Sequence, residues 1–109
     1  MNAAGMLVAL RQVYGTLGMP FYESLVTDGS VSVDELYGTR QHLAGVISTL
    51  EATPSEKIEA LVAEHNKELT AHLDKFNAIG QQDFIGGFRI AQTMVGYVTT
   101  IMNKSGIRG

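Results

Sequence analysis

The stretch QQDFIGGFRIAQTMVGYVTTIMN, residues 81–103, is the most apolar part of the chain and decides how the fold is interpreted. Its segment from Phe84 to Met102 approaches the length of a membrane span. However, its charged, polar and small residues follow one stripe: Arg89, Gln92, Thr93, Gly96, Thr100 and Asn103. The apolar residues cover the rest of the surface, so we expect a helix over residues 83–103 that packs on a protein core.

Two adjacent glycines, Gly86 and Gly87, interrupt this helical pattern. Each costs about 1 kcal/mol relative to alanine inside a helix, which is tolerated where another backbone or a ligand comes close. The small residues would form a groove: Gly86, Thr93, Gly96 and Thr100. Two explanations are open. The groove packs against an earlier helix, where Gly38 and Gly45 form a similar stripe, or it is a contact surface for another subunit, a partner protein or an anion.

Arg89 is the charged residue within the segment from Phe84 to Met102. A guanidinium group favours carboxylate or phosphate partners that it can contact with two hydrogen bonds. The simplest partner is a carboxylate of the chain itself, and we name Asp34, Glu35 and Glu68 as candidates.

Local signals mark the boundaries of the preceding helices. SVDE at Ser32 and TPSE at Thr53 both read as capping boxes, in which a hydroxyl and a glutamate satisfy free N–H groups. They predict helices over 33–52 and 54–79, the latter ending at Gly80. Asp83 then caps the final helix.

The first third of the chain predicts helices over 3–15 and 20–27, separated by the helix-breaking GTLGMP. Residues 104–109 are expected to form a frayed tail. Helices joined by short loops become antiparallel neighbours. We therefore expect one all-α domain over 1–109, a four-helix bundle-like fold with an extra short helical turn after the first helix.

Composition excludes several function classes. The chain has 109 residues, a formal net charge of −3 and no cysteine, so thiolate metal sites and cysteine nucleophiles are absent. Its eight basic residues are scattered, whereas nucleic-acid binding favours a basic stripe. The N-terminus has no basic region typical of a signal peptide. Only 17% of residues are charged, which favours self-association.

The three histidines do not form a recognisable metal site. His65 and His72 continue the apolar stripe of the predicted 54–79 helix, about 10.5 Å apart along its axis, too far to share one ion. The Glu-x-x-His motif of di-iron bundles also fails, because the residues three before the histidines are Thr39, Val62 and Leu69. We expect histidines at the border of the core, paired with a carboxylate or a backbone carbonyl.

No nucleophile elbow and no glycine-rich phosphate loop is recognisable, so we expect no enzyme, no cofactor and no metal.

Residues 73–98, LDKFNAIGQQDFIGGFRIAQTMVGYV, resemble the C-terminal signature of a small all-helical family from bacterial genomes and prophages. That signature reads F-I-x-G-F-R-L-G-A-R-L-M, and its matching positions here are Phe84, Ile85, Gly87, Phe88, Arg89, Ile90 and Met94. Gly86 replaces the usual aromatic, and Ala91 and Gln92 replace Gly and Ala. Residues 21–37 resemble the family's early turn, with TDG in place of YYG. The resemblance implies a helical fold and a mobile-element setting, and no catalytic residue.

These observations favour a non-catalytic interaction protein of phage type. It would bind and modulate a host protein, for example by inhibiting a defence-system component, in the cytoplasm of the host cell. The alternative is a homo-oligomer, a dimer or higher, that sequesters a small anionic ligand such as a nucleotide. Neither function involves a nucleic acid or a membrane. The expected binding residues are Arg89, Gly86, Gly87, Gln92, Thr93, Gly96, His65 and His72.

Overall fold

The computed structural model describes residues 1–108, which form five helices and no strand. These are α1 (Ala3–Leu17), α2 (Pro20–Thr27), α3 (Val33–Glu51), α4 (Ser55–Ile79) and α5 (Phe84–Lys104). The predicted all-α, bundle-like fold class is confirmed. The largest difference in bounds is at α1, which continues two residues past Gly15 and ends before Gly18, its C-cap.

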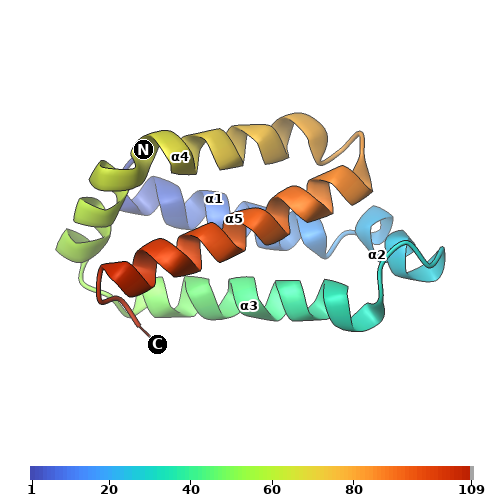
Figure 1. The fold of residues 1–109 in the computed structure, drawn as a ribbon, viewed down its shortest axis with the longest axis horizontal. Coiled ribbons are helices and arrows are strands. Elements are labelled where there is room, and N and C mark those ends of the chain that lie inside the picture. The colour runs from blue at the N-terminus through green and yellow to red at the C-terminus, as the bar shows by residue number, and fades with distance from the viewer. Residues whose placement is uncertain (109) are drawn as a thin grey trace.

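Four long helices form the bundle, and α2 covers one of its ends (Figure 1). The packed neighbours are α1 with α3, α3 with α5, α5 with α4, and α4 with α1, while α2 contacts α1, α3 and α5. α3 and α4 follow one another in the chain but are not packed neighbours. The expectation that helices joined by a short loop are neighbours is therefore wrong for α3 and α4, whose connection crosses the bundle diagonally.

A kink in α4 accompanies this diagonal crossing. His65 has non-helical backbone angles, φ −116° and ψ 16°, inside the helix. The first turns of α4 climb across one end of the bundle, and the rest runs along its length beside α5 (Figure 1). No proline or glycine lies near the kink, so the sequence contains no local marker for it.

Three helix starts were predicted from capping residues, and two are confirmed. The Ser32 hydroxyl accepts the Glu35 N–H at 3.0 Å, and the Asp83 carboxylate accepts the Gly86 N–H at 2.8 Å. The cap predicted at Thr53 is wrong. Its hydroxyl donates to the carbonyl of Thr49 at 2.7 Å, so it completes the end of α3, and Pro54 becomes the N-cap of α4 without a side-chain bond.

Each helix buries one stripe of apolar side chains. In α1 the buried residues follow helical spacing at Met6, Leu10, Val13 and Leu17. The same pattern recurs on α3, α4 and α5. Removing this apolar surface from water is the main term that stabilises the bundle. α1 also makes a polar contact with α4, because the N–H of Ala3 donates to the Glu59 carboxylate. The first helix thus docks on its own bundle.

Within the segment predicted as a frayed tail, Lys104 belongs to α5 and Ile107 is buried; Gly109 lies outside the described residues. Gly106 has φ +75°, and two hydrogen bonds follow: Gly106 N–H to the Asn103 carbonyl, and Ile107 N–H to the Met102 carbonyl. This is a Schellman motif, which places Ile107 against Met102. Ile107 is only 3% exposed, and its burial anchors the tail.

Candidate functional site

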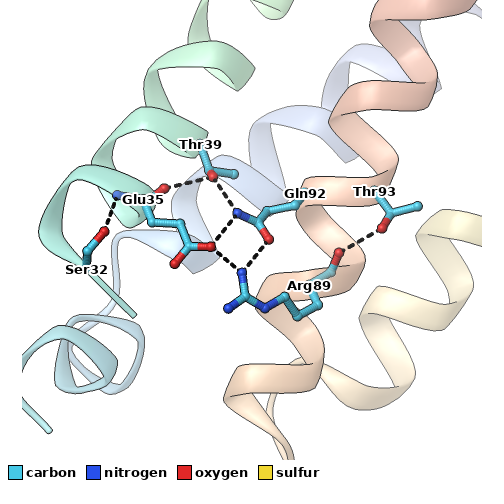
Figure 2. Close-up of polar contacts among 6 residues, drawn as sticks. All are labelled: Ser32, Glu35, Thr39, Arg89, Gln92 and Thr93. Carbon is cyan, nitrogen blue, oxygen red and sulfur yellow. Dashed lines mark hydrogen bonds and ion pairs between the residues drawn. The ribbon is translucent and has the colours of Figure 1, made fainter. Parts of the chain in front are cut away.

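Arg89 belongs to a polar network between α5 and α3, shown in Figure 2. Its guanidinium donates to the Glu35 carboxylate and to the side-chain oxygen of Gln92, the latter at 2.8 Å. The Gln92 amide donates in turn to Glu35 and to the Thr39 hydroxyl, at 3.3 and 3.4 Å. Of the three carboxylates proposed for Arg89, the structure selects Glu35.

This network favours the ionised form of Glu35. The hydrogen bond from Arg89, followed by that from Gln92, lowers the pKa of the Glu35 carboxyl below its ordinary value. Arg89 is nevertheless 50% exposed and Glu35 34% exposed. Surface ion pairs of this kind contribute little to stability, but the pair fixes the direction of the Arg89 side chain while part of it stays in contact with solvent.

Gly86 and Gly87 have local structural roles. Gly86 lies beneath the Asp83 carboxylate that caps α5. Gly87 is buried where α2, the α4–α5 turn and α5 meet: the Tyr22 hydroxyl donates to the Gly80 carbonyl at 2.7 Å directly beside it. A Cβ atom at position 87 would overlap that hydroxyl and lie 2.8 Å from Cα of Gly80. The fold itself therefore requires a glycine at position 87.

The remaining small residues of α5 face solvent. Thr93, Gly96 and Thr100 are exposed, and both threonine hydroxyls donate to carbonyls of their own helix, those of Arg89 and Gly96. A Cβ atom at Gly96 would meet no atom within 4 Å, and the same holds at Gly38 and Gly45. Close packing between these glycine stripes is therefore not the explanation for them.

His65 and His72 meet on one aromatic side chain. The Nδ1 atom of His65 lies 3.3 Å from the Tyr97 hydroxyl, and the His72 ring centroid lies 5.0 Å from that of Tyr97. Burial, followed by the charges of Glu68 and Glu64, raises the pKa of Tyr97. The Nε2 atom of His65 also lies 3.9 Å from the Glu64 carboxylate, in line with the expected carboxylate partner, whereas His72 packs against the Tyr97 ring.

A hollow of about 260 Å³ lies between α4 and α5. It brings together three predicted binding residues, His72, Arg89 and Thr93, with Lys75 and Ile90, which were not predicted as binding residues. Lys75 follows His72 by three positions and Thr93 follows Arg89 by four, so each pair shares a helix face. We call the exposed side formed by His72, Lys75, Arg89, Thr93 and Gly96 the α4–α5 face.

The other predicted residues lie outside this hollow. Gly86 belongs to the Asp83 cap, Gly87 packs against Tyr22 and Gly80, and Gln92 belongs to the Glu35 network. His65 reaches the face only through Tyr97. Within residues 1–108, no cluster of three or more His, Cys, Asp or Glu side chains has the geometry to hold a metal ion.

No protein-family model, no curated protein and no solved structure matches this chain. Among the helices of residues 1–108, none combines the length and apolar character needed to cross a bilayer.

Proposed function

We propose that this chain is a non-catalytic interaction protein that binds another protein through the α4–α5 face. The observation that carries the proposal is Gly96. A glycine inside a helix costs about 1 kcal/mol relative to alanine, and here no neighbouring atom of the chain requires it. A partner whose backbone or side chain approaches α5 closely would account for that cost.

The chemistry beside Gly96 favours an acidic group on the partner. The hollow is lined by His72, Lys75 and Arg89 together with Ile90 and Thr93, and no carboxylate is part of this lining. Arg89 is already held by Glu35 and Gln92, so little conformational freedom is lost when it binds. The face thus supplies a directed cation beside an apolar side chain and a groove of small residues.

The class of partner follows from the resemblance to a prophage family. It favours a host protein, such as a defence-system component, that the bound chain would inhibit in the host cytoplasm. Inhibition by occlusion needs no catalytic residue of this chain.

Site-specific photo-crosslinking tests the face directly. A benzophenone side chain is placed at Thr93 and, as a control, at Gln12, which is exposed on α1. In native cells we expect one discrete crosslinked protein at Thr93 and none at Gln12. The partner is then identified by mass spectrometry, purified, and titrated with the chain.

Two matched variants decide whether Gly96 is part of the contact. Gly96→Trp and Gly38→Trp each add a large side chain at an exposed helical glycine with open space around it. We expect Gly96→Trp to weaken partner binding at least tenfold and Gly38→Trp to leave it unchanged, with both variants retaining the helical circular-dichroism spectrum. Equal binding by the two folded variants would rule out this face.

A second candidate function uses the same hollow for a small anion, such as a nucleotide, bound by a homo-oligomer. The basic lining favours it. At about 260 Å³ the hollow lies below the roughly 300–1,000 Å³ of typical small-molecule sites, so a second subunit would have to complete it. Native mass spectrometry with absorbance at 260 nm separates the alternatives, because a monomer without bound ligand contradicts sequestration.

A further inference from the structure

A second hollow, of about 360 Å³, lies between α3 and the C-terminal end of α5. Figure 1 shows this end of α5 and the tail beside the C-terminal half of α3. The hollow shares no lining residue with the α4–α5 face. Its volume lies within the range of small-molecule sites, about 300–1,000 Å³.

The floor of this hollow is apolar and firmly held. Val46 of α3, Met102 of α5 and Ile107 of the tail are all buried and contribute to the lining. The Schellman hydrogen bond from Ile107 N–H to the Met102 carbonyl, 2.9 Å, fixes the tail against the helix. The tail is therefore a wall of the hollow, formed before any ligand binds.

The rim is polar and bears no carboxylate among the described residues. The rim includes His42 of α3, Thr99 of α5 and Arg108 of the tail. The Thr99 hydroxyl lies within hydrogen-bond distance of both the Val95 carbonyl, at 2.8 Å, and the Nε2 atom of His42, at 2.9 Å. The contact with Thr99 orients the imidazole and leaves its Nδ1 atom to other partners.

Gly45 keeps the hollow open. It lies on the same face of α3 as His42 and Val46 and lines the hollow, and a Cβ atom there would meet nothing within 4 Å. A larger side chain at this position would extend into open space without displacing core residues.

We propose that this hollow binds a small carboxylate with an apolar body, such as a medium-chain fatty acid. The apolar part would lie on Val46, Met102 and Ile107, and the carboxylate would meet Arg108. The complementarity is electrostatic as well as hydrophobic: the lining contains basic and neutral side chains, although the whole chain carries a net charge of −3. The inference is independent of the proposed protein partner.

Octanoate is the probe for the test, titrated into the ¹⁵N-labelled full chain. We expect saturable amide shifts at Gly45, Val46, Met102 and Ile107. Gly45→Leu should abolish them, because its side chain occupies the hollow. Arg108→Gln should weaken binding about tenfold, the effect of losing one charge-assisted hydrogen bond. Lys67→Gln, which removes one positive charge from an exposed position on α4, should bind octanoate as the unchanged chain does.

Three results would overturn the proposal. One is the absence of saturable shifts around the hollow. Another is unchanged octanoate binding by Gly45→Leu, with its fold verified by circular dichroism. The third is equal affinity for octanamide, a neutral molecule of the same length, since this would remove the role of Arg108 and of the negative charge.

Discussion

Gly87 and Gly96 lie on the same helix, yet the same added methyl group should have opposite effects at the two positions. At Gly87 the new Cβ atom would overlap the Tyr22 hydroxyl and lie 2.8 Å from Cα of Gly80. Overpacking of this kind costs about 1–3 kcal/mol, and displacing the Tyr22 hydroxyl from the Gly80 carbonyl costs about 1 kcal/mol more. A gain of about 1 kcal/mol from helix propensity offsets part of this. We expect Gly87→Ala to lower the free energy of unfolding by about 1–3 kcal/mol.

At Gly96 the new Cβ atom would meet no atom within 4 Å. Only the propensity term remains, so Gly96→Ala should raise the free energy of unfolding by up to about 1 kcal/mol. For a domain of this size that corresponds to a rise in Tm of about 4 °C. Urea and thermal unfolding, followed by circular dichroism at 222 nm, measure both variants under the same conditions.

A double-mutant cycle tests the cause of the effect at Gly87. Tyr22→Phe removes the hydroxyl that the new methyl group would overlap, so Gly87→Ala should cost less in the Tyr22→Phe background than in the unchanged chain. An equal cost in both backgrounds would show that the hydroxyl is not the obstacle. A Gly87→Ala variant as stable as the unchanged chain would refute the close-approach explanation altogether.

Three further predictions concern charge and the chain end. Because the pKa of Glu35 is lowered, its ionised carboxylate stabilises the folded state above the ordinary carboxyl range, and this stabilisation is lost as pH falls through the lowered pKa. In a series of unfolding measurements at decreasing pH, the difference in stability between the unchanged chain and Glu35→Gln should therefore shrink. Burial, with a smaller contribution from the charge of Asp83, raises the pKa of Tyr22 from 10.0 to about 12. The protonated Tyr22 side chain therefore stabilises the folded state fully below pH 10, and this stabilisation is lost as pH rises through 12. We expect the stability advantage of the unchanged chain over Tyr22→Phe, measured by urea unfolding, to fall by about 2–3 kcal/mol over that interval. Gly106→Ala forces a residue with a Cβ atom to φ +75°, which should lower the free energy of unfolding by about 1–2 kcal/mol. The variant should also speed hydrogen exchange at the Ile107 amide. Unchanged exchange would contradict a tail held by the Schellman motif.

The features that the sequence predicted correctly are local ones. The caps at Ser32 and Asp83 depend on a side chain and an N–H group three residues later, so neighbouring letters suffice to predict them. Thr53 shows the limit of such signals. Its hydroxyl could serve either the preceding helix or the next one, and it bonds to the Thr49 carbonyl behind it. The same sequence signal was compatible with both outcomes.

The diagonal connection between α3 and α4 could not be predicted in this way. The kink at His65 has no proline or glycine beside it, and it occurs where α4 passes from the bundle end to its position beside α1 and α5. Tertiary packing, not local preference, determines that geometry. Lys75 and Tyr97 were missed for a related reason, because they join the site only through the contact of α4 with α5.

Glycine itself carries different information at different positions. Gly87 is required by a buried hydroxyl from another helix, Gly106 by a positive φ, and Gly96 by nothing within the chain. The sequence shows the same residue at all three positions, whereas the structure assigns Gly106 to backbone geometry and Gly87 to internal packing, and shows open space beside Gly96. Gly38 and Gly45 are equally open, so openness alone does not indicate an external contact. Gly96 carries the functional proposal because it shares the α4–α5 face with the basic side chains of His72, Lys75 and Arg89, whereas Gly87, although predicted as a binding residue, is explained by internal packing.

The two proposed sites can fail independently because they lie on different sides of α5. Thr93, at the α4–α5 face, and Met102, in the second hollow, are nine positions apart, about 13 Å along the helix. Gly96→Trp obstructs the first site and Gly45→Leu fills the second, and neither position has an internal neighbour that the new side chain would displace. If one variant abolished both partner binding and octanoate binding while remaining folded, the two sites would be coupled through α5, and treating them as separate surfaces would be wrong.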